Sequence, residues 1–300
     1  TSREVQTRIL CISDTHSGRP SAFYSKDKGF RKPLPKADLL IHSGDLTMTG
    51  KMVEYEDALS MLIDIDAEVK LVIAGNHDLT LDEDYIRKKK RPVERHPMQL
   101  DHLYEEGIAQ RAMELWTSPR AKEAGIRYLT EGLHEVQLSN GAQFGVYASP
   151  WQPEFRNWAF NYPHHEDRWS QIETKQVGKI DIFITHGPPH MHLDLCASGA
   201  RAGCVHLMDA LRRVRPRLHV FGHIHEAWGA ERIKWEDNMR SIPQRIGDSE
   251  EVKRRHAVFV DMSSDENRLK PREETLLVNA CVVDLKYEAE NAGWLIDMDL

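Results

Sequence analysis

Seven residues of types that commonly bind metal ions follow directly after five short apolar stretches of the chain. The stretches cover residues 8–12, 39–41, 70–73, 180–184 and 218–221. The candidate ligands that follow them are Asp14, His16, Asp45, Asn76, His186, His223 and His225. These side chains offer imidazole nitrogen and carboxylate or amide oxygen but no sulfur, which suits catalytic Zn, Fe, Mn or Co better than a structural zinc ion. The sequence therefore predicts a catalytic metal centre.

The five apolar stretches are typical of buried strands in a layered α/β protein, because they are short, rich in β-branched residues and bounded by Gly, Asp and Asn. Open α/β sheets place their sites beyond the carboxyl ends of such strands. Residues i and i+2 of a strand or its extended exit face the same side, so Asp14 and His16 can bind one ion together, and His223 and His225 likewise. Seven ligands are too many for one catalytic ion with an open position, but they suit two ions bridged by Asp45.

The order of these motifs resembles a known superfamily. The segments 14–16, 44–45, 75–78, 186–187 and 222–225 read D-x-H, G-D, G-N-H-D, H-G and G-H-x-H, as in the calcineurin-like metallophosphoesterases. A narrower similarity, to the metallophosphoesterase-domain-containing (MPPED) phosphodiesterase branch, rests on residues 185–189, 203–205, 215–222 and 279–280. The resemblance covers nearly the whole chain except about 231–275. It implies an α/β fold in which a double β-sandwich is flanked by helices, a four-layer αββα sandwich.

The resemblance also implies a role for each residue of the motifs. It assigns the first metal ion to Asp14, His16, Asp45 and His225, and the second to Asp45, Asn76, His186 and His223. It makes His77 a general acid and phosphate contact, not a ligand. Met48 stands where phosphoprotein phosphatases of the superfamily carry the Asp that orients this acid, so the group that orients His77 stays open. Asp78 is either a partner of the site or the cap of the following helix.

These residues predict a metal-dependent phosphodiesterase, in which a hydroxide bridging two ions attacks phosphorus in line and His77 protonates the leaving alkoxide. A diester is preferred to a dianionic monoester because residues 46–49 and Ala74 place no arginine in the ligand loops. Arg156 or Arg201 could still reach the site from elsewhere. The expected partner is a small phosphodiester, with cyclic nucleotides among the candidates. A phosphomonoesterase or nuclease, and a catalytically silent scaffold, stay open as alternatives.

The composition is that of an ordinary globular protein. Of 300 residues, 40% are hydrophobic and 29% charged, and 40 basic against 47 acidic residues give a net charge of -7. An acidic balance argues against a general binder of nucleic acid or of anionic membranes. We find no apolar run of about 18 residues, no signal-peptide pattern at the N-terminus and no disulfide pattern among the four cysteines. We therefore expect a single cytoplasmic domain over residues 1–300.

Regular elements are expected between the ligand loops. Apolar spacing predicts helices over 51–66 and 205–214, and capping residues predict a short one over 118–125. The turn Ser139-Asn140-Gly141 predicts a hairpin. Dense charge of both signs predicts a surface insertion over about 231–275. After it, a core strand at 276–278 with 281–283 resumes, and an acidic tail ends the chain.

Several residues have both a structural and a functional interpretation. His42 and His219 lie inside strand-like stretches, so we expect them to be structural. His190 and His192 have the spacing of ligands but follow His186 in a loop. An aromatic group could either wall a substrate pocket or fill the core, and consists of Trp151, Phe155, Trp158, Phe160 and Tyr162. The basic run 88–91 is expected to be a solvated helix end.

Overall fold

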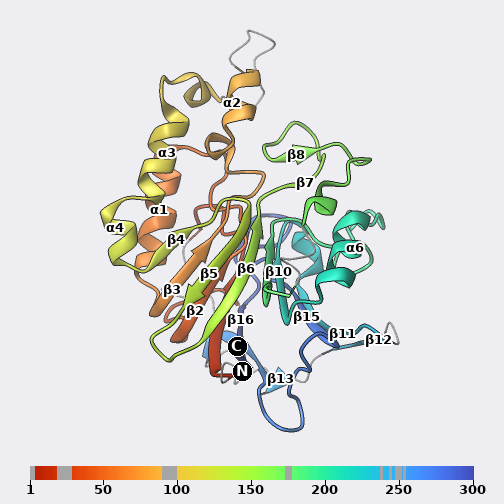
Figure 1. Ribbon diagram of the computed structural model, residues 1–300. Helices are drawn as coiled ribbons and strands as arrows, with labels where there is room; N and C mark the ends of the chain where they lie inside the picture. The colour runs from red at the N-terminus through yellow and green to blue at the C-terminus, as the bar shows by residue number, and fades with distance from the viewer. Residues whose placement is uncertain are drawn as a thin grey trace.

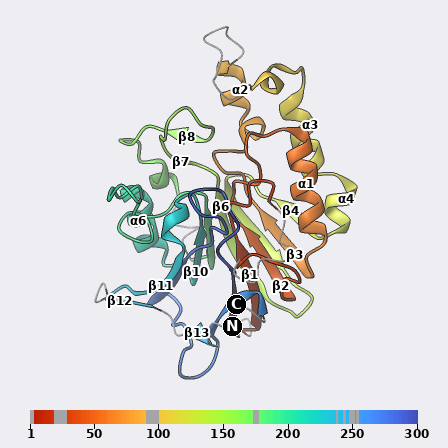
Figure 2. The same ribbon diagram turned by 180° about the vertical axis from the view of Figure 1, so that it is seen from behind.

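Two seven-stranded sheets form the centre of the molecule, with helices on the outer side of each (Figure 1). The computed structural model describes residues 4–18, 29–89, 100–172, 178–236, 239–242, 245–246, 252 and 255–300. The principal helices are α1 (Met52–Ile63), α3 (Ile108–Trp116), α4 (Pro119–Glu123) and α6 (Val205–Val214). Figure 2 shows from behind that α1, α3 and α4 lie beside one sheet and α6 beside the other. This arrangement confirms the α/β, four-layer αββα fold.

The sheets combine strands from the whole length of the chain. The first sheet has the order β13 (Arg245–Ile246), β14 (Ala257–Met262), β16 (Gly293–Asp299), β1 (Gln6–Ile12), β2 (Ala37–His42), β3 (Ala67–Val72), β4 (Ile126–Tyr128). The second has the order β12 (Met239–Ser241), β11 (Gly229–Lys234), β15 (Glu274–Asn279), β10 (Leu218–Phe221), β9 (Ile182–Thr185), β6 (Gln143–Ser149), β5 (Gly132–Gln137). A separate pair consists of β7 (Gln152–Pro153) and β8 (Asn161–Tyr162).

Parallel strands bring the ligand loops to one edge of each sheet. Strands β1, β2, β3 and β4 run parallel to one another, and so do β6, β9, β10 and β15. In the first sheet Ile12 pairs with His42, and His42 pairs with Val72, so the three strands end at the same level. The loops that follow parallel strands therefore meet at their carboxyl edge, where open α/β sheets form their sites.

Three buried apolar layers explain why the strand sequences are almost continuously apolar. Ile9 and Cys11 of β1 belong to the layer between the two sheets, whereas Leu10 and Ile12 belong to the layer under the helices. The third layer lies between the second sheet and α6, and includes Phe183. Side chains alternate between the faces of a strand, and both faces are covered here. A strand buried on both faces needs apolar residues at every position.

The expected helices and the hairpin are confirmed. The hydroxyl of Ser118 accepts a hydrogen bond from the amide of Ala121, which caps α4 at its predicted start. Strands β5 and β6 pair as antiparallel partners around the predicted turn. Further helical segments among the described residues are η1 (Leu79–Leu81), α2 (Glu83–Lys89), η2 (Asp101–Tyr104), η3 (Arg168–Gln171) and η4 (His225–Ala227). Lys90 and Arg91 of the basic run lie outside the described residues.

The prediction of a surface insertion over 231–275 is wrong for two of its segments. Strand β11 pairs with β15 in the second sheet, and β14 pairs with β16 inside the first. Val258 and Val260 of β14 are buried between the sheets. The apolar residues of β14 are few and are flanked by long charged segments. The composition of residues 231–275 as a whole is therefore that of a solvated loop, although it contains a buried strand. That the chain forms a single domain stays a prediction.

The prediction of an acidic tail is also wrong. Residues 293–299 form β16, which lies between β14 and β1 and pairs antiparallel with β1. Trp294 and Ile296 are fully buried, while Asp297 forms a bidentate pair with Arg8 on the neighbouring strand. In this strand apolar residues alternate with acidic ones, and the sequence does not reveal that an acidic residue such as Asp297 has a basic partner on another strand. The segment therefore resembles a solvated tail. The expected strand at 281–283 is a buried segment with a single bridge, between Ser13 and Cys281.

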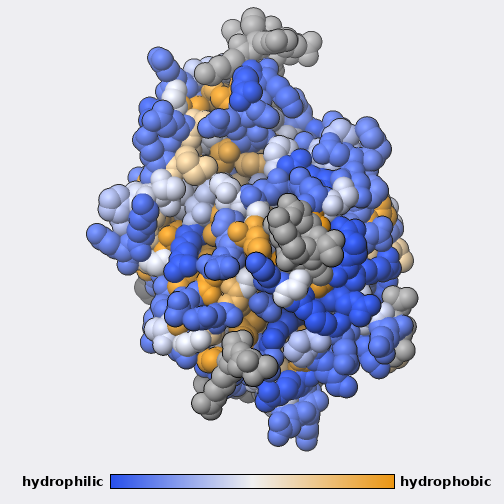
Figure 3. Space-filling model, in the orientation of Figure 1, coloured by the Kyte–Doolittle hydropathy of each residue, from blue (hydrophilic) through white to orange (hydrophobic). Residues whose placement is uncertain are grey.

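The surface reflects the high content of charged residues. The face in Figure 3 is mostly hydrophilic, and hydrophobic residues appear on it in small areas between polar ones. Within the described parts of the chain, every helix is too short or too polar to cross a bilayer.

Candidate metal centre

The predicted ligands converge at the carboxyl edges of both sheets. One group of donor atoms comes from Asp14, His16, Asp45 and His225, and a second comes from Asp45, His186 and His223. The atoms of each group lie within 4.8 Å of one another, and Asp45 belongs to both groups. Loops after β1, β2, β9 and β10 carry these residues, so both sheets contribute to one centre.

Short distances define the first group. The Nε2 atoms of His16 and His225 lie 3.3 Å apart. Nε2 of His225 is 3.4 Å from Oδ1 of Asp14, and Nε2 of His16 is 3.6 Å from Oδ2 of Asp45. All four side chains therefore direct nitrogen or oxygen atoms at one small volume, as a metal ion requires.

The second group is built around His186. Its Nε2 atom lies 3.4 Å from Oδ1 of Asp45 and 2.8 Å from Oδ1 of Asn76. Asn76, which follows β3, thus joins the group that contains His223. The structure brings all seven predicted ligands together in the two expected sets, while their roles as metal ligands stay predictions.

The backbone fixes the histidine rings with their Nε2 atoms facing the centre. The Nδ1 atoms of His16, His186 and His225 lie 3.0, 3.0 and 3.1 Å from the carbonyl oxygens of Thr47, Ser43 and Asp284. A carbonyl oxygen only accepts, so each Nδ1 donates, and the Nε2 atom of a ring carries a lone pair whenever that ring is neutral. Two such lone pairs meet 3.3 Å apart in the first group and repel unless a cation or proton lies between them. The donor set therefore fits bound metal ions.

The electrostatics of the centre also favour metal binding. Burial lowers the pKa of His16 and of His223 to about 3, so both rings are neutral near pH 7 and offer lone pairs. His186 behaves differently. Burial acts to lower its pKa, but the Asp45 carboxylate outweighs burial and raises the pKa of His186 to about 9. In the metal-free site this imidazolium therefore neutralises the buried carboxylate of Asp45, and His186 must lose its Nε2 proton when it binds a metal ion.

Several ligands have backbone conformations that are unfavourable for residues with a side chain. The φ angles are 53° at Asp14, 45° at His16, 54° at Asp45 and 69° at His223. Each such left-handed residue costs on the order of 1–3 kcal/mol and persists where the surrounding structure imposes it, most often at functional sites. A Cβ atom at Gly222 would collide with the carboxylate of Asp14, so the backbone approaches the centre too closely here for any residue with a side chain.

His77 lies beside the donor groups without belonging to them. Its Nδ1 atom lies 2.8 Å from the carbonyl oxygen of Met48, and its ring stacks on Trp158 with centroids 3.9 Å apart. Its ring is also 4.6 Å from that of His16, edge to face. The backbone of Met48, not its side chain, therefore orients His77, which answers the question raised by the missing aspartate.

Asp78 connects two ligand loops and does not contact the donor atoms. Its carboxylate accepts hydrogen bonds from the amides of Leu46, Thr47 and Gly75, and from the hydroxyl of Thr47. Its side chain does not cap η1. Burial, together with the nearby Asp45, raises the pKa of Asp78 to about 7. Asp78 therefore links the loop that carries Asp45 to the loop that carries Asn76 and fixes their relative position.

Replacing Asp78 with alanine should lower the free energy of unfolding by about 3–5 kcal/mol, because three buried amides lose their acceptor. Urea denaturation of the metal-free protein measures this effect without a contribution from metal binding. Asp84→Ala, which removes an exposed carboxylate paired with Arg87, is the control and should change stability little. An equal, small effect of both substitutions would contradict the structural role of Asp78.

A buried thiol touches one of the ligands. Sγ of Cys281 lies 2.9 Å from Oδ2 of Asp14, and the amide of His223 donates to the same carboxylate at 3.1 Å. Both groups fix the orientation of Asp14. The other cysteines are free thiols, as expected, and Cys11 and Cys204 are buried.

The residues with two interpretations are now placed. His42 and His219 are fully buried and contact the hydroxyls of Thr15 and Thr185, so their structural role is confirmed. Neither His190 nor His192 belongs to a donor group. Nδ1 of His192 lies 2.7 Å from Glu231, and Nδ1 of His190 lies 3.6 Å from Asp194.

The aromatic group divides between core and site. Phe160 and Tyr162 are buried, and Phe160 packs edge to face on Trp151. Trp158 stacks on His77, and the ring of Phe155 lies 5.7 Å from that of His223 with 46% of Phe155 exposed. The core interpretation is therefore confirmed for Phe160 and Tyr162, while for Trp158 and Phe155, which lie beside the candidate centre, the substrate-pocket interpretation stays a prediction.

Sequence reasoning missed Tyr287 altogether. Its ring lies 4.8 Å from His16 and 5.3 Å from His225, edge to face. The residue belongs to the region interpreted as an acidic tail, and no motif there singles out a tyrosine at the site.

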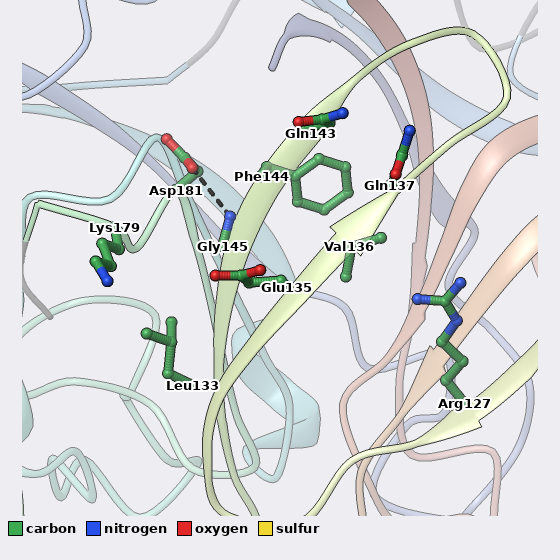
Figure 4. Close-up of a pocket in the computed structure, with 10 residues that line it drawn as sticks. All are labelled: Arg127, Leu133, Glu135, Val136, Gln137, Gln143, Phe144, Gly145, Lys179 and Asp181. Atoms are coloured by element: carbon green, nitrogen blue, oxygen red, sulfur yellow. Dashed lines mark hydrogen bonds between the residues drawn. The ribbon is translucent and has the colours of Figure 1, made fainter. Parts of the chain in front are cut away.

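A separate hollow of about 460 Å³ lies on the β5–β6 hairpin. Figure 4 shows Arg127 and Lys179 on different sides of it, with Glu135 and Asp181 between. Asp181 already accepts the amide of Gly145 at 3.1 Å and pairs with Arg217 at 3.6 Å. Asp181 is therefore already engaged within the fold, and none of the candidate ligands lines this hollow.

Comparison with known proteins agrees with this geometry. The model of the calcineurin-like phosphoesterase family matches residues 7–227. The chain belongs to this family. Metallophosphoesterase domain-containing protein 1 of Homo sapiens and that of Mus musculus are each 36% identical to it over 228 residues, which is 74% of this chain and 62% of theirs. The UPF0046 protein T07D4.2 of Caenorhabditis elegans is 32% identical over 228 residues, 74% of this chain and 52% of that protein.

The family establishes a phosphoesterase hydrolase fold with a candidate His/Asp metal site. The matched region is less than two thirds of the length of the human and mouse relatives. The substrate of this chain is therefore a separate question, which the site itself must answer.

Proposed function

We propose that this member of the family is a metal-dependent phosphodiesterase. The observation that carries the proposal is the pair of donor groups that share Asp45, with His77 beside them as a histidine that is not a ligand. Metal ions at such a pair polarise phosphoryl oxygens and lower the pKa of water. We propose Mn, Fe or Zn because the donors are imidazoles and carboxylates.

The residues of the chain orient the metal ligands and supply a proton to the leaving oxygen. The carbonyls of Thr47, Ser43 and Asp284 hold three ligand rings, so their lone pairs are aligned before substrate arrives. The carbonyl of Met48 occupies Nδ1 of His77, which leaves Nε2 as the atom that carries a proton to the leaving oxygen. Stacking on Trp158 prevents rotation of this ring.

The preference for a diester is supported by the position of Arg201. This arginine is paired with the buried Asp194 at 2.6 Å and is committed to that contact. Arg156 lies over the ring of Phe155, with its guanidinium carbon 5.3 Å from the ring centroid, and therefore offers one positive charge at the margin of the second donor group. A dianionic monoester would gain most from arginine at its phosphoryl oxygens. A monoanionic diester needs less positive charge and has a second organic group, which the exposed aromatic side chains can contact.

The test compares two substrates with the same leaving group in the presence of Mn²⁺. We expect faster turnover of bis-p-nitrophenyl phosphate than of p-nitrophenyl phosphate. Since both release the same leaving group, a difference in rate reports only the charge and the second ester group. The measurement is kcat/KM for both at one pH. The reverse order would make the protein a phosphomonoesterase.

The cysteines are consistent with the proposed cytoplasmic location, since all four are free thiols.

A further inference from the structure

One aromatic residue covers the metal centre without any assigned role. The ring of Tyr287 lies edge-on to three histidines, with centroids 4.8 Å from His16, 5.3 Å from His225 and 6.0 Å from His77. The residue is 43% exposed. One part of the ring therefore lies against the first donor group, and the rest is open to an incoming molecule.

The chain holds Tyr287 in this place by a specific turn. Its φ is 61°, a left-handed conformation that is unfavourable for a tyrosine. Oδ1 of Asp284 accepts the amides of Lys286 and Glu288, and the carbonyl of Asp284 accepts the amide of Tyr287. That carbonyl also lies 3.1 Å from Nδ1 of His225. One residue, Asp284, thus orients a metal ligand and presents the tyrosine beside it, and such imposed strain is typical of functional positions.

A second exposed aromatic ring lies at the other donor group. Phe155 is edge to face with His223 at 5.7 Å, and Arg156 lies over it. Each donor group therefore has an aromatic ring at its margin, one on the 284–288 turn and one on the 155–156 loop.

We propose that Tyr287 is a specificity-determining residue that packs against the organic group of the phosphoryl ligand and selects flat, unsaturated groups over small alkyl groups. The proposal rests on the proposed function, because it takes the phosphoryl group to lie at the donor groups. The perpendicular contacts with the histidines cover part of the ring, and its 43% exposure leaves ring surface for offset stacking, one of the geometries that aromatic pairs prefer. A methyl group offers no such face.

The test measures binding of phenylphosphonate and methylphosphonate to the Mn²⁺-loaded protein by calorimetry, which needs no turnover. Tyr287→Ala should weaken the binding of phenylphosphonate by about 3- to 10-fold and the binding of methylphosphonate by less than about 2-fold. Tyr287→Phe should keep the preference, since the ring remains. Tyr104→Ala removes a similarly exposed tyrosine outside the centre and is the control. Metal content is measured in every variant.

Two results would overturn the proposal. Equal weakening of both phosphonates, with the same loss in Tyr287→Phe, would show that the hydroxyl acts on the phosphoryl group. Unchanged preference in Tyr287→Ala would show that the ring does not contact the ligand. If diesters are not hydrolysed but the phenyl preference depends on Tyr287, the proposed function fails and the inference on Tyr287 stands.

Discussion

Replacing His77 with alanine should lower kcat by about 10²–10⁴-fold for diesters with poor leaving groups, while both metal ions stay bound. A positioned acid contributes this much because an alkoxide leaves slowly without a proton. The side chain of His77 is held by the carbonyl of Met48 and the ring of Trp158. Its backbone amide donates to Asp45, and this contact remains in alanine, while its ring only packs edge to face on that of His16. For a p-nitrophenyl ester the decrease should be smaller, because p-nitrophenolate needs little help from a proton.

The control for this experiment is His134→Ala. His134 is also held by a backbone carbonyl, that of Thr130 at 2.8 Å, but it lies on β5. Its replacement should leave kcat and metal content unchanged. Loss of a metal ion in His77→Ala, or an equal decrease for good and poor leaving groups, would contradict the role of His77 as an acid.

Replacing Asp45 with asparagine should weaken binding of both metal ions, each by more than about 100-fold, and abolish turnover. Groups that merely orient a ligand contribute about 10–100-fold in affinity, and Asp45 itself belongs to both donor groups. The substitution keeps the shape of the side chain but removes its charge. Metal content after dialysis, measured by elemental analysis, should fall from about two ions per chain toward none.

His223→Gly is the matched comparison, because His223 belongs only to the second group. It should lower occupancy of the second ion and keep the first. Asp209→Asn, at an exposed carboxylate paired with Arg212, should retain both ions. Wild-type protein treated with chelator should lose activity and regain it with added Mn²⁺. If Asp45→Asn keeps one ion at full affinity, Asp45 does not bridge, and if chelated protein remains active, the reaction needs no metal.

The parts of the fold that could be predicted from the sequence are those in which the local pattern of apolar residues matches the burial of the segment in the folded protein. Strands such as β1 are buried on both faces, so continuous apolar residues mark them wherever they occur. The ligands follow these strands at once, and parallel pairing brings their loops together. Order along the chain was therefore enough to predict which side chains meet.

The parts that could not be predicted depend on contacts with no sequence pattern. The apolar core of β14 is hidden by charged flanks, and the acidic residues of β16 are matched by partners such as Arg8 that lie far away in the sequence. The group that orients His77 is a backbone carbonyl, which every residue has. Tyr287 reaches the site through a turn fixed by Asp284, and a single tyrosine carries no spacing signal.

The position of β16 has a consequence for how the protein matures during synthesis. Strand β1 has β16 as one of its two neighbours, and the paired residues Arg8 and Asp297 lie 289 positions apart, so β16 is synthesised long after β1. Until then the strand that leads to Asp14 and His16 has one unpaired edge, and contacts this distant in the sequence form slowly. The nascent chain therefore completes the sheet beneath Asp14 and His16 only after residues 293–299 have been synthesised, and until that moment it presents an open strand edge to chaperones and to aggregation.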